Sequence, residues 1–312
     1  MIRYLHQNEI DRDKWDHCIL HAFNGMIYGY SWYLDIVAPR WEGLVENDYE
    51  RVFPLPGSRR LGIDYIFQPF FTQQLGLFSV SILNPEKVHE FLNAIPSRYK
   101  WIELNLNTLN KIDSDGFQVS PQVNHELDLI QPYDGISRNY HTNTRRNLKK
   151  AAESGLNIVK NIQPGDVIQL FRQNRGKDVT TLKDDDYKRL SRLIHTCLHK
   201  GIAEVYGVYN HVNELCAGAV FVTANKKAIF LFSGMNQEGR ESRAMFLLID
   251  HFIREHAQSH LVLDFDGSND PDLARFYRGF GSNECHYLRV TADRLPPLAS
   301  WMKNLKSRFY NE

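Results

Sequence analysis

The apolar residues of this chain recur with two different spacings, and the alternation of these spacings predicts a mixture of helices and strands. In the first half, helical spacing predicts helices over residues 9–22, 31–36 and 85–95. Every-second-residue alternation predicts strands over residues 41–45, 51–54, 63–68, 101–106 and 125–129. The first half is therefore expected to be mixed α/β.

The second half repeats this theme with a clearer order of elements. Helices are expected over residues 145–154, 164–174, 185–200, 242–257 and 273–277. Strands are expected over residues 157–160, 203–209, 216–223, 228–233, 261–265 and 285–290. Short gaps that contain Asn join the three strands between residues 203 and 233, which favours antiparallel hairpins. Helices, an antiparallel meander and two late strand–helix alternations are the order of an acyl-CoA N-acyltransferase fold.

The fold class predicted from this order is α+β, with two tandem N-acetyltransferase-like domains. The first half carries a vaguer version of the order found in the second. A domain boundary is expected near residues 132–136, where the sequence reads PYDGI. The expected domains are residues 1–135 and residues 136–312.

The composition is that of an ordinary globular protein. Of the 312 residues, 43% are hydrophobic and 24% are charged, and 37 basic residues balance 37 acidic ones. A net charge of zero argues against a general nucleic-acid-binding surface, so DNA is not expected as a partner. No apolar stretch reaches the ~20 residues of a membrane helix, and the N-terminus is too polar for a signal peptide. We therefore expect a cytoplasmic protein without a membrane span.

The cysteines and histidines show no spacing typical of a metal site. The four cysteines lie far apart and form no Cys-x-x-Cys pair, which predicts reduced thiols in the core. The 13 histidines form no metal-spaced pair with a neighbouring Cys or Glu. The sequence predicts neither a disulfide framework nor a metal or redox cofactor.

One short segment, residues 137–155, concentrates positive charge in this neutral chain. Helical spacing places Arg145 above Lys149 and Arg146 above Lys150, so that two basic rows lie side by side. A local cationic block predicts a local anionic partner. Arg145, Arg146 and Lys149 are therefore candidate ligands of a substrate phosphate. The alternative is a solvated helix face.

A second candidate site follows a short apolar strand. In the expected strand 261–265, Asp264 shares a face with Asp266, whereas Leu263 and Phe265 point the other way. Open α/β sheets bind ligands at the carboxyl ends of their strands. One of the two carboxylates is thus a candidate to position or deprotonate an attacking amine. Asp264 is expected to be the more buried and Asp266 the better placed for chemistry. The alternative is that one Asp anchors the turn and the other is solvated.

These motifs, taken in order, resemble those of the FemAB-type peptidyltransferases. NTRRNLKKAAESGL is similar to the basic helix of that family, and LDFDGSND…FYRGFGS is similar to its strand–turn–helix element. YSWYLDIV near the N-terminus resembles an early helix of the family. The resemblance covers most of the chain and implies two acyltransferase-like domains. It also implies transfer of an amino acid from aminoacyl-tRNA onto the stem peptide of a peptidoglycan precursor, and it favours Asp264 over Asp266 as the characteristic carboxylate.

The sequence of residues 234–245 distinguishes between two kinds of acyltransferase, those that bind acetyl-CoA and those that resemble FemAB. Ordinary N-acetyltransferases hold the pyrophosphate of acetyl-CoA on the backbone amides of a Gly-rich loop before a helix. Here Arg240 or Arg243 falls where that loop needs Gly, which favours a FemAB-like transferase. The alternatives are that Arg240 and Arg243 bind a phosphate through their side chains, or that the helix start is merely solvated.

Arg59 and Arg60 form a further basic pair. They lie in a segment bounded by Pro and Gly between two expected strands, which predicts a turn. If the two halves of the chain face each other, the pair could add to the cationic rim around a diphosphate. A solvated turn tip is the alternative.

The sequence as a whole predicts an acyltransferase resembling FemAB. It would transfer an aminoacyl or acyl group to an amine of a phosphate-bearing, cell-envelope precursor-like acceptor. No cofactor is expected, and aminoacyl-tRNA is the donor that the resemblance implies. One alternative is an N-acyltransferase that uses acetyl-CoA or another acyl-CoA as donor. The other is a non-catalytic protein that binds a nucleotide-sugar or polysaccharide precursor.

Overall fold

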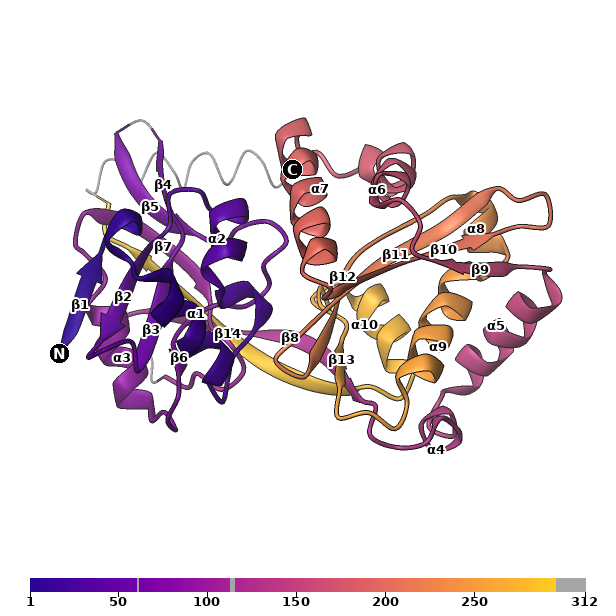
Figure 1. Ribbon diagram of the computed structural model, residues 1–312, viewed down its shortest axis with the longest axis horizontal. Helices are drawn as coiled ribbons and strands as arrows, with labels where there is room; N and C mark the ends of the chain where they lie inside the picture. Colours follow the sequence, from indigo (N-terminus) through magenta and orange to yellow (C-terminus); the bar gives the residue numbers. More distant parts are fainter. Residues whose placement is uncertain (61, 113–115, 296–312) are drawn as a thin grey trace. The chain divides into compact units, whose positions relative to one another are not determined.

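The computed structural model describes residues 1–60, 62–112 and 116–295. Within them the chain forms two compact units, one of Met1–Gln122 with the segment from His286 onward, and one of Val123–Cys285. Two strands, β8 (Gln118–Asp128) and β14 (Asn283–Asp293), carry the chain from the first unit into the second and back (Figure 1). Helices and strands mix throughout both units, so the predicted α+β class is confirmed.

The first unit combines short helices with short strands. Its helices are η1 (Gln7–Glu9), α1 (Arg12–His21), η2 (Ile27–Gly29), α2 (Ser31–Val37) and α3 (Pro85–Asn93). Its strands, besides its parts of β8 and β14, are β1 (Ile2–Leu5), β2 (Glu42–Glu46), β3 (Arg51–Leu55), β4 (Gly57–Arg60), β5 (Ile63–Phe67), β6 (Phe78–Ser79) and β7 (Tyr99–Asn105). Two fully buried tryptophans, Trp15 and Trp41, meet edge to face with ring centroids 4.8 Å apart and mark its core.

A buried proline divides the strands of the first unit between two sheets. Their orders are β1-β2-β3-β6 and β4-β5-β7-β14. Only Pro56 separates β3 from β4, and a proline has no N–H to donate to a ladder. The single acyltransferase-like sheet expected for the first half is therefore split. The tandem arrangement of two acyltransferase-like domains stays a prediction.

Arg59 and Arg60 are in a strand, and the turn predicted for them is wrong. They end β4, where Arg59 pairs across the hairpin with Asp64 and Arg60 with Ile63. Arg59 Nε also lies 3.7 Å from Asp64 Oδ1. The cross-strand carboxylate favours the extended pairing, and the chain reverses further on, at Gly62, whose φ is 81°.

The second unit is built around a mixed sheet with helices on both faces (Figure 1). Its helices are α4 (Tyr133–Ser137), α5 (Thr142–Glu153), α6 (Pro164–Gln173), η3 (Arg175–Lys177), α7 (Asp184–His199), α8 (Gln237–Glu241), α9 (Ala244–His256) and α10 (Pro271–Arg278). Its strands, besides its parts of β8 and β14, are β9 (Asn157–Lys160), β10 (Ala203–Tyr209), β11 (Leu215–Ala224), β12 (Lys227–Met235) and β13 (Val262–Asp264). The strand order is β8-β13-β12-β11-β10-β9, and β12–β13 is its parallel pair.

Alternation along the strands builds the core of this unit. Tyr206 on β10 and Phe221 on β11 point toward α9, where Phe221 stacks on Phe252 with ring centroids 3.8 Å apart. On the other face, α6 crosses β11 and β12 at glycines: a Cβ on Gly218 would lie 2.8 Å from Val167 Cγ2, and one on Gly234 would lie 2.7 Å from Phe171 N. This close crossing fixes the height of α6 above β12.

The compact units differ from the expected domains of residues 1–135 and 136–312. The chain leaves the first unit after Gln122 rather than near residue 135, because residues 126–128 at the end of β8 pair with β13 of the second unit. The expected boundary at residues 132–136 lies inside the second unit, where α4 begins at Tyr133. The last strand returns to the first unit, where residues 289–293 pair with β7. The division into independent domains stays a prediction.

Candidate functional site

The candidate site lies where the parallel strands β12 and β13 stop pairing with each other. Residues 227–229 of β12 pair with residues 262–264 of β13, but β12 continues without this partner to Met235. Beyond β13 the backbone turns through Asp266 and Gly267, which both have left-handed φ values, 53° and 64°. The parallel partner thus ends early, and the carboxyl half of β12 becomes one wall of a cavity of ≈ 920 Å³.

The floor of this cavity is apolar. Its buried and half-buried side chains come from the end of α6, from β12, from the start of α9 and from α10: Phe171, Phe230, Met235, Met245, Phe246, Phe276 and Tyr277. Phe246 and Phe276 lie edge to face with centroids 4.7 Å apart. Such a floor excludes water, which strengthens electrostatic interactions at its rim.

Two of the predicted site residues, Arg240 and Arg243, meet at the rim of the cavity. Arg243 has a left-handed φ of 64° directly before α9, and its Nη1 donates a hydrogen bond to Arg240 O at 3.1 Å. Arg243 Nε is buried and has no hydrogen-bond partner among the described residues. Neither guanidinium pairs with a carboxylate of the described chain. Two uncompensated guanidinium groups suit an anionic group bound at this rim.

The backbone amides of the α8 turn are already used inside the protein. Asn236 Oδ1 accepts from Gly239 N at 2.8 Å, and Arg240 N donates to Asn236 O at 3.2 Å. α8 also sits against β11, since a Cβ on Gly239 would lie 2.3 Å from Cys216 O. Where a Gly-rich loop would cradle a phosphate on free amides, this chain has the hydrogen-bonded turn of α8. An anion beside α8 would therefore be held by the side chains of Arg240 and Arg243.

A buried phenol completes the cavity wall. The ring of Tyr277 stacks on Phe265 with centroids 4.7 Å apart, and Tyr277 is 4% exposed. Burial raises the pKa of Tyr277, and the carboxylates of Asp266 and Asp270 raise it further. The phenol therefore stays protonated at neutral pH and can donate a hydrogen bond to a bound group.

Asp264 lies apart from the cavity and is only 1% exposed. Its Oδ1 accepts from Asn124 Nδ2 at 2.8 Å and from the backbone N of Asp266 at 3.1 Å, while its Oδ2 is 3.5 Å from Lys227 Nζ. Burial raises the pKa of Asp264, against the opposing effect of Lys227. The predicted burial of Asp264 is confirmed.

Lys227 joins this buried carboxylate to a second strand. It pairs with Glu126 on β8 as well as with Asp264 on β13. Burial opposes its charge, but Asp264 and Glu126 raise the pKa of Lys227 overall. The three side chains tie β8, β12 and β13 together at the end where the parallel strands pair.

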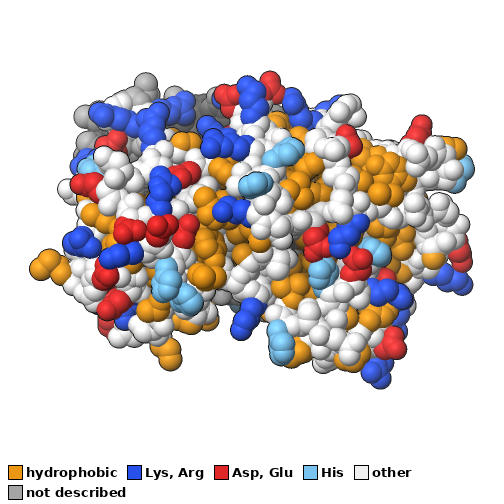
Figure 2. Space-filling view, in the orientation of Figure 1, with side chains coloured by type: hydrophobic (Ala, Val, Ile, Leu, Met, Phe, Trp, Pro, Cys, Tyr) orange, Lys and Arg blue, Asp and Glu red, His pale blue; other side chains and the backbone are white. Residues whose placement is uncertain are grey.

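The basic residues of α5 form an exposed surface of their own. Arg145, Arg146, Lys149 and Lys150 are all exposed, and several Lys and Arg side chains lie over α5 at the lower right of Figure 2. Arg145 Nη2 donates to Arg138 O at 2.5 Å, and Arg146 Nη2 donates to Asn143 Oδ1 at 2.9 Å. Within the described part of the chain none of the four has an acidic partner. The predicted basic rows therefore exist, on a helix that begins at Thr142, three residues earlier than expected.

The helix α5 is anchored to α10. His141 N donates to Gly279 O at 2.9 Å, and a Cβ on Gly279 would lie 2.4 Å from the buried Thr144 Oγ1. Gly279 belongs to the FYRGFGS motif and Thr144 to the NTRR motif. The two motifs singled out in the sequence therefore contact each other at the ends of their helices.

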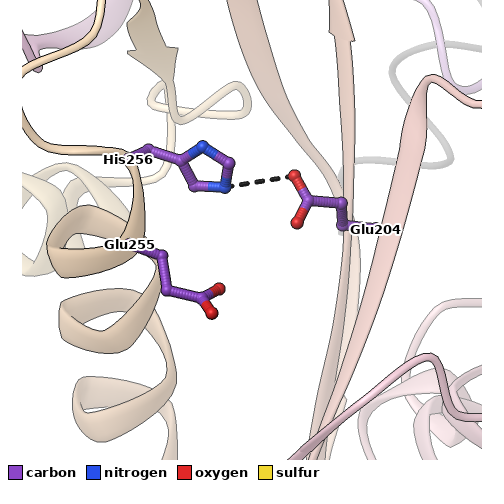
Figure 3. Close-up of side chains that lie close together, drawn as sticks. All are labelled: Glu204, Glu255 and His256. Carbon is purple, nitrogen blue, oxygen red and sulfur yellow. Dashed lines mark ion pairs between the residues drawn. The ribbon is translucent and has the colours of Figure 1, made fainter.

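A cluster of possible metal ligands lies at the far end of α9. Glu204, Glu255 and His256 offer ligand atoms within 4.8 Å of one another, and His256 Nε2 is 3.1 Å from Glu204 Oε1 (Figure 3). Lys160 Nζ occupies the same space, 2.5 Å from Glu204 Oε2 and 3.5 Å from Glu255 Oε2. Tyr206 OH lies within hydrogen-bonding distance of both carboxylates, 2.8 Å from Glu204 Oε2 and 2.5 Å from Glu255 Oε2. The carboxylates are thus neutralised by ion pairs, and we assign no metal to them.

No family model and no curated protein matches this sequence. Solved structures do match over almost the whole chain. FemX superposes with a TM-score of 0.65 at 12% identity, covering 96% of this chain and 99% of FemX. A C-terminal domain assigned to lysylphosphatidylglycerol synthetase from Agrobacterium fabrum gives 0.55 at 11% identity, covering 93% of this chain and 94% of that domain. L-PGS from Bacillus licheniformis gives 0.53 at 9% identity, covering 94% and 95%.

The chain has a FemAB-type fold. This fold is what the two sequence motifs predicted, and it is reached without sequence similarity beyond 12% identity to FemX. The longest helix in the described part of this FemAB-type fold is α7 with 16 residues, and none of the described helices is both long and apolar enough to cross a bilayer.

Sequence reasoning found some residues of the site in this FemAB-type fold and missed others. It singled out Arg240 and Arg243, which the structure brings together at the cavity. It placed Asp264 correctly at the end of β13, but Asp266 does not share a strand face with it, because the strand ends at Asp264 and Asp266 lies in the left-handed turn that follows. Neither is among the described residues that line the cavity. It missed Arg175 and the aromatic floor. Tyr277 stood in the quoted FYRGFG motif, but only the fold shows that its ring faces the cavity.

Proposed function

We propose that this protein is an acyltransferase that moves an aminoacyl or acyl group from an activated ester to an amine on a phosphate-bearing acceptor. The observation that carries this proposal is the pair of uncompensated arginines, Arg240 and Arg243, at the rim of an apolar cavity beside parted parallel strands. The fold shared with FemX and L-PGS supports the reaction class by analogy. A cell-envelope precursor is the proposed acceptor, aminoacyl-tRNA the proposed donor and the cytoplasm the proposed location.

In the proposed reaction one bond forms, one bond breaks and one proton is transferred. The amine nitrogen attacks the carbonyl carbon of the donor, a C–N bond forms, and the bond from that carbon to the leaving oxygen breaks. The proton that the amine loses ends on the leaving oxygen. Because Tyr277 stays protonated and lines the cavity, we propose that its phenol stabilises that oxygen by hydrogen bonding. Positioning of the two reactants supplies the rest, so the proposal includes no metal and no redox cofactor.

The two carboxylates of β13 take different parts in the proposal. Asp264 is tied to Lys227 and Asn124, so we propose that it holds the strands and the turn. Asp266 is half-buried in the left-handed turn and lies close enough to Tyr277 to raise its pKa. We propose that Asp266 steers the incoming amine. The resemblance to FemAB-type enzymes favours Asp264 instead, and substitution of each decides between them.

The basic rows of α5 are the proposed site for a substrate phosphate. Arg145, Arg146 and Lys149 lie exposed on one helix without acidic partners in the described chain, which leaves their charges available. We propose no role for Arg59 and Arg60, because β4 belongs to the other compact unit and Arg59 already pairs with Asp64.

Calorimetric titration with three ligands tests the proposal: a UDP-linked muropeptide, acetyl-CoA and unacylated tRNA. Binding of the muropeptide and the tRNA, with turnover once the tRNA is aminoacylated, is the expected result. Tight binding of acetyl-CoA alone would favour a coenzyme A-dependent N-acyltransferase. Binding of the muropeptide without any transfer would favour a non-catalytic binding protein.

Substitution of single arginines locates the anionic groups. Arg240→Ala or Arg243→Ala should weaken binding of the donor by about 1.5–3 kcal/mol, the scale of a hydrogen bond to a charged group. Arg145→Ala should weaken binding of the acceptor by a smaller amount that shrinks at high salt, because that side chain is exposed. Arg192→Ala, an exposed arginine on α7, is the matched control and should change neither.

A further inference from the structure

The cavity next to Arg240 and Arg243 is larger than a methyl-sized group requires. Its volume of ≈ 920 Å³ falls in the range of roughly 300–1,000 Å³ that buries most of a drug-sized ligand. The lining side chains that are buried, Phe230, Met245 and Tyr277, are apolar or aromatic. A glycyl or acetyl group would touch only a small part of this floor, and the rest would lack the contacts that give dispersion energy.

Four of the five charged lining side chains are exposed at the rim, and the fifth, Arg243, is half-buried. Arg240 and Asp270 are exposed, and the side chains of Arg175 and Asp272 are 63% and 84% exposed. Leu273, 41% exposed, extends the apolar surface of the floor outward to the mouth. The site therefore presents one continuous apolar surface that begins beside the anion-binding arginines and runs inward.

The aromatic pairs of the floor are nearly perpendicular. Phe246 and Phe276 meet at an interplanar angle of 83°, and Phe230 and Tyr277 meet at 81°. One face of Tyr277 is already covered by Phe265, which stacks on it. A perpendicular pair forms no parallel slot for a base, whereas an aliphatic group packs on ring faces and ring edges alike.

We infer that the group seated on this floor is apolar and much larger than a methyl. It is an aliphatic acyl chain or the side chain of a hydrophobic aminoacyl group, joined to the anionic part held by Arg240 and Arg243. The inference rests on the proposed function in one respect, namely that the seated group is the one transferred. Its binding can be measured without any transfer.

A homologous series of ligands tests the inference on the full chain. Ethyl, butyl, hexyl and octyl phosphate carry the same anion and differ only in the apolar chain, and adenosine monophosphate carries the anion with a base. Calorimetry should show affinity rising about fourfold per added methylene, the equivalent of ~0.8 kcal/mol for each buried CH₂. Equal affinity along the series, or tighter binding of adenosine monophosphate than of octyl phosphate, would overturn the inference.

Two matched leucine variants test whether the alkyl chain of the ligand lies in this cavity. Leu273→Asn should weaken binding of octyl phosphate about threefold to tenfold and leave ethyl phosphate unchanged. Leu109→Asn, at an exposed leucine of the first unit, should change neither ligand. An equal loss in both variants, or no loss in either, would place the chain outside this cavity and overturn the inference.

The binding series and the transfer assay can fail separately. A dependence on chain length without transfer to any amine would remove the proposed reaction and leave this inference intact. Transfer of glycyl or acetyl groups without any gain for larger apolar groups would keep the reaction and overturn this inference.

Discussion

At the scale of single residues, the two aspartates of the β13 turn are alike in sequence and different in surroundings. Asp264 has an amide donor, a backbone donor and a lysine around its carboxylate. Asp266 is half-buried, and its left-handed φ of 53° is a conformation that Asp and Asn tolerate better than most side chains. Substitution by Asn keeps the shape at each position and removes the charge.

We expect Asp264→Asn to lower the free energy of unfolding by about 1–3 kcal/mol, because an amide would then face the ammonium of Lys227. Asp266→Asn should leave stability within about 0.5 kcal/mol and lower kcat, since the backbone conformation suits Asn. Chemical denaturation and steady-state kinetics measure the two effects. Loss of kcat in a stably folded Asp264→Asn variant, with Asp266→Asn fully active, would show that Asp264 is the functional carboxylate.

Glu204 makes the free energy of unfolding of the second unit depend on pH in the acid range. The hydrogen bond from His256 lowers the pKa of Glu204 to about 2, burial opposes the shift, and Lys160 and Tyr206 add to the lowering. A carboxylate with a depressed pKa stabilises the folded state above its unfolded pKa of ~4.3, and this contribution is lost as the pH falls towards 2.

We therefore expect Glu204→Gln to reduce stability at pH ~7 by about 1–2 kcal/mol and to flatten the loss of stability between pH ~5 and ~2. Glu153→Gln at the exposed end of α5 is the matched control. Urea unfolding at several pH values measures both. Parallel stability curves for wild type and Glu204→Gln across this acid range would contradict the assignment.

Sequence reasoning at this scale succeeded where a simple periodicity decides the outcome. The earlier position of Asp264 in the expected strand was enough to predict that it is more buried than Asp266. Sequence reasoning could not show that Arg243 adopts a left-handed conformation, because that depends on the turn of α8 against Cys216. The cavity floor was also out of reach, since its rings come from four elements far apart in the chain.

At the scale of elements, the crossing of α6 over β12 shapes the cavity. Phe171 lines the cavity from the end of α6, and the helix backbone sits directly over Gly234. A side chain at residue 234 would meet backbone atoms, at 2.7 Å from Phe171 N and 2.8 Å from Val167 O. Backbone atoms of a helix cannot move aside one at a time, so the whole helix would have to shift.

Gly234→Ala should lower the free energy of unfolding by about 1–3 kcal/mol and weaken ligand binding at the cavity. Gly165→Ala is the matched control: it lies in α6 with no atom within 4 Å of the added Cβ, and should be neutral or stabilising by up to about 1 kcal/mol. Thermal unfolding and calorimetry measure these effects. An unchanged Gly234→Ala variant would mean that α6 does not rest on β12 as described.

Most elements could be predicted because their apolar residues follow one period over a whole segment. The amphipathic helices α3, α6 and α7 and the hairpin strands β10, β11 and β12 fall close to the expected ranges. Among the missed elements, α8 and α4 have five residues each, too few to show a helical period. The strand β8 was predicted only from residue 125, although it begins at Gln118. β4 was taken for a turn because Pro and Gly flank it, although the ladder with β5 decides its conformation.

At the scale of the whole molecule, the chain leaves the first compact unit and later returns to it, and this path decides which segments can fold together. The first compact unit needs β14, whose residues 289–293 pair with β7 and whose Tyr287 and Val290 are buried. The expected domain of residues 1–135 lacks this strand. Only local sequence order guided that expectation, and the return of a distant strand is a long-range event that local patterns do not reveal.

We expect a fragment of residues 123–285 to unfold cooperatively, and a fragment of residues 1–135 to show no cooperative transition. Joining residues 1–122 to residues 286–312 through a short Gly-Ser linker should restore a transition, because β14 is then available to β7. Circular dichroism during heating measures all three. A cooperative transition of the 1–135 fragment would support the domain boundary predicted from the sequence.

The double passage of the chain through β8 and β14 also has a mechanical consequence. Residues 1 and 293 both belong to the first compact unit, and the sequence of the second unit, Val123–Cys285, lies between them in the chain. Tension applied across these two residues therefore loads the β1–β2 and β7–β14 ladders, which lie at the two points of attachment, before it reaches the strands around Arg243. Single-molecule pulling from these two residues should first record the shorter gain in chain length, from unfolding of the first unit. The longer gain, from unfolding of Val123–Cys285, should follow.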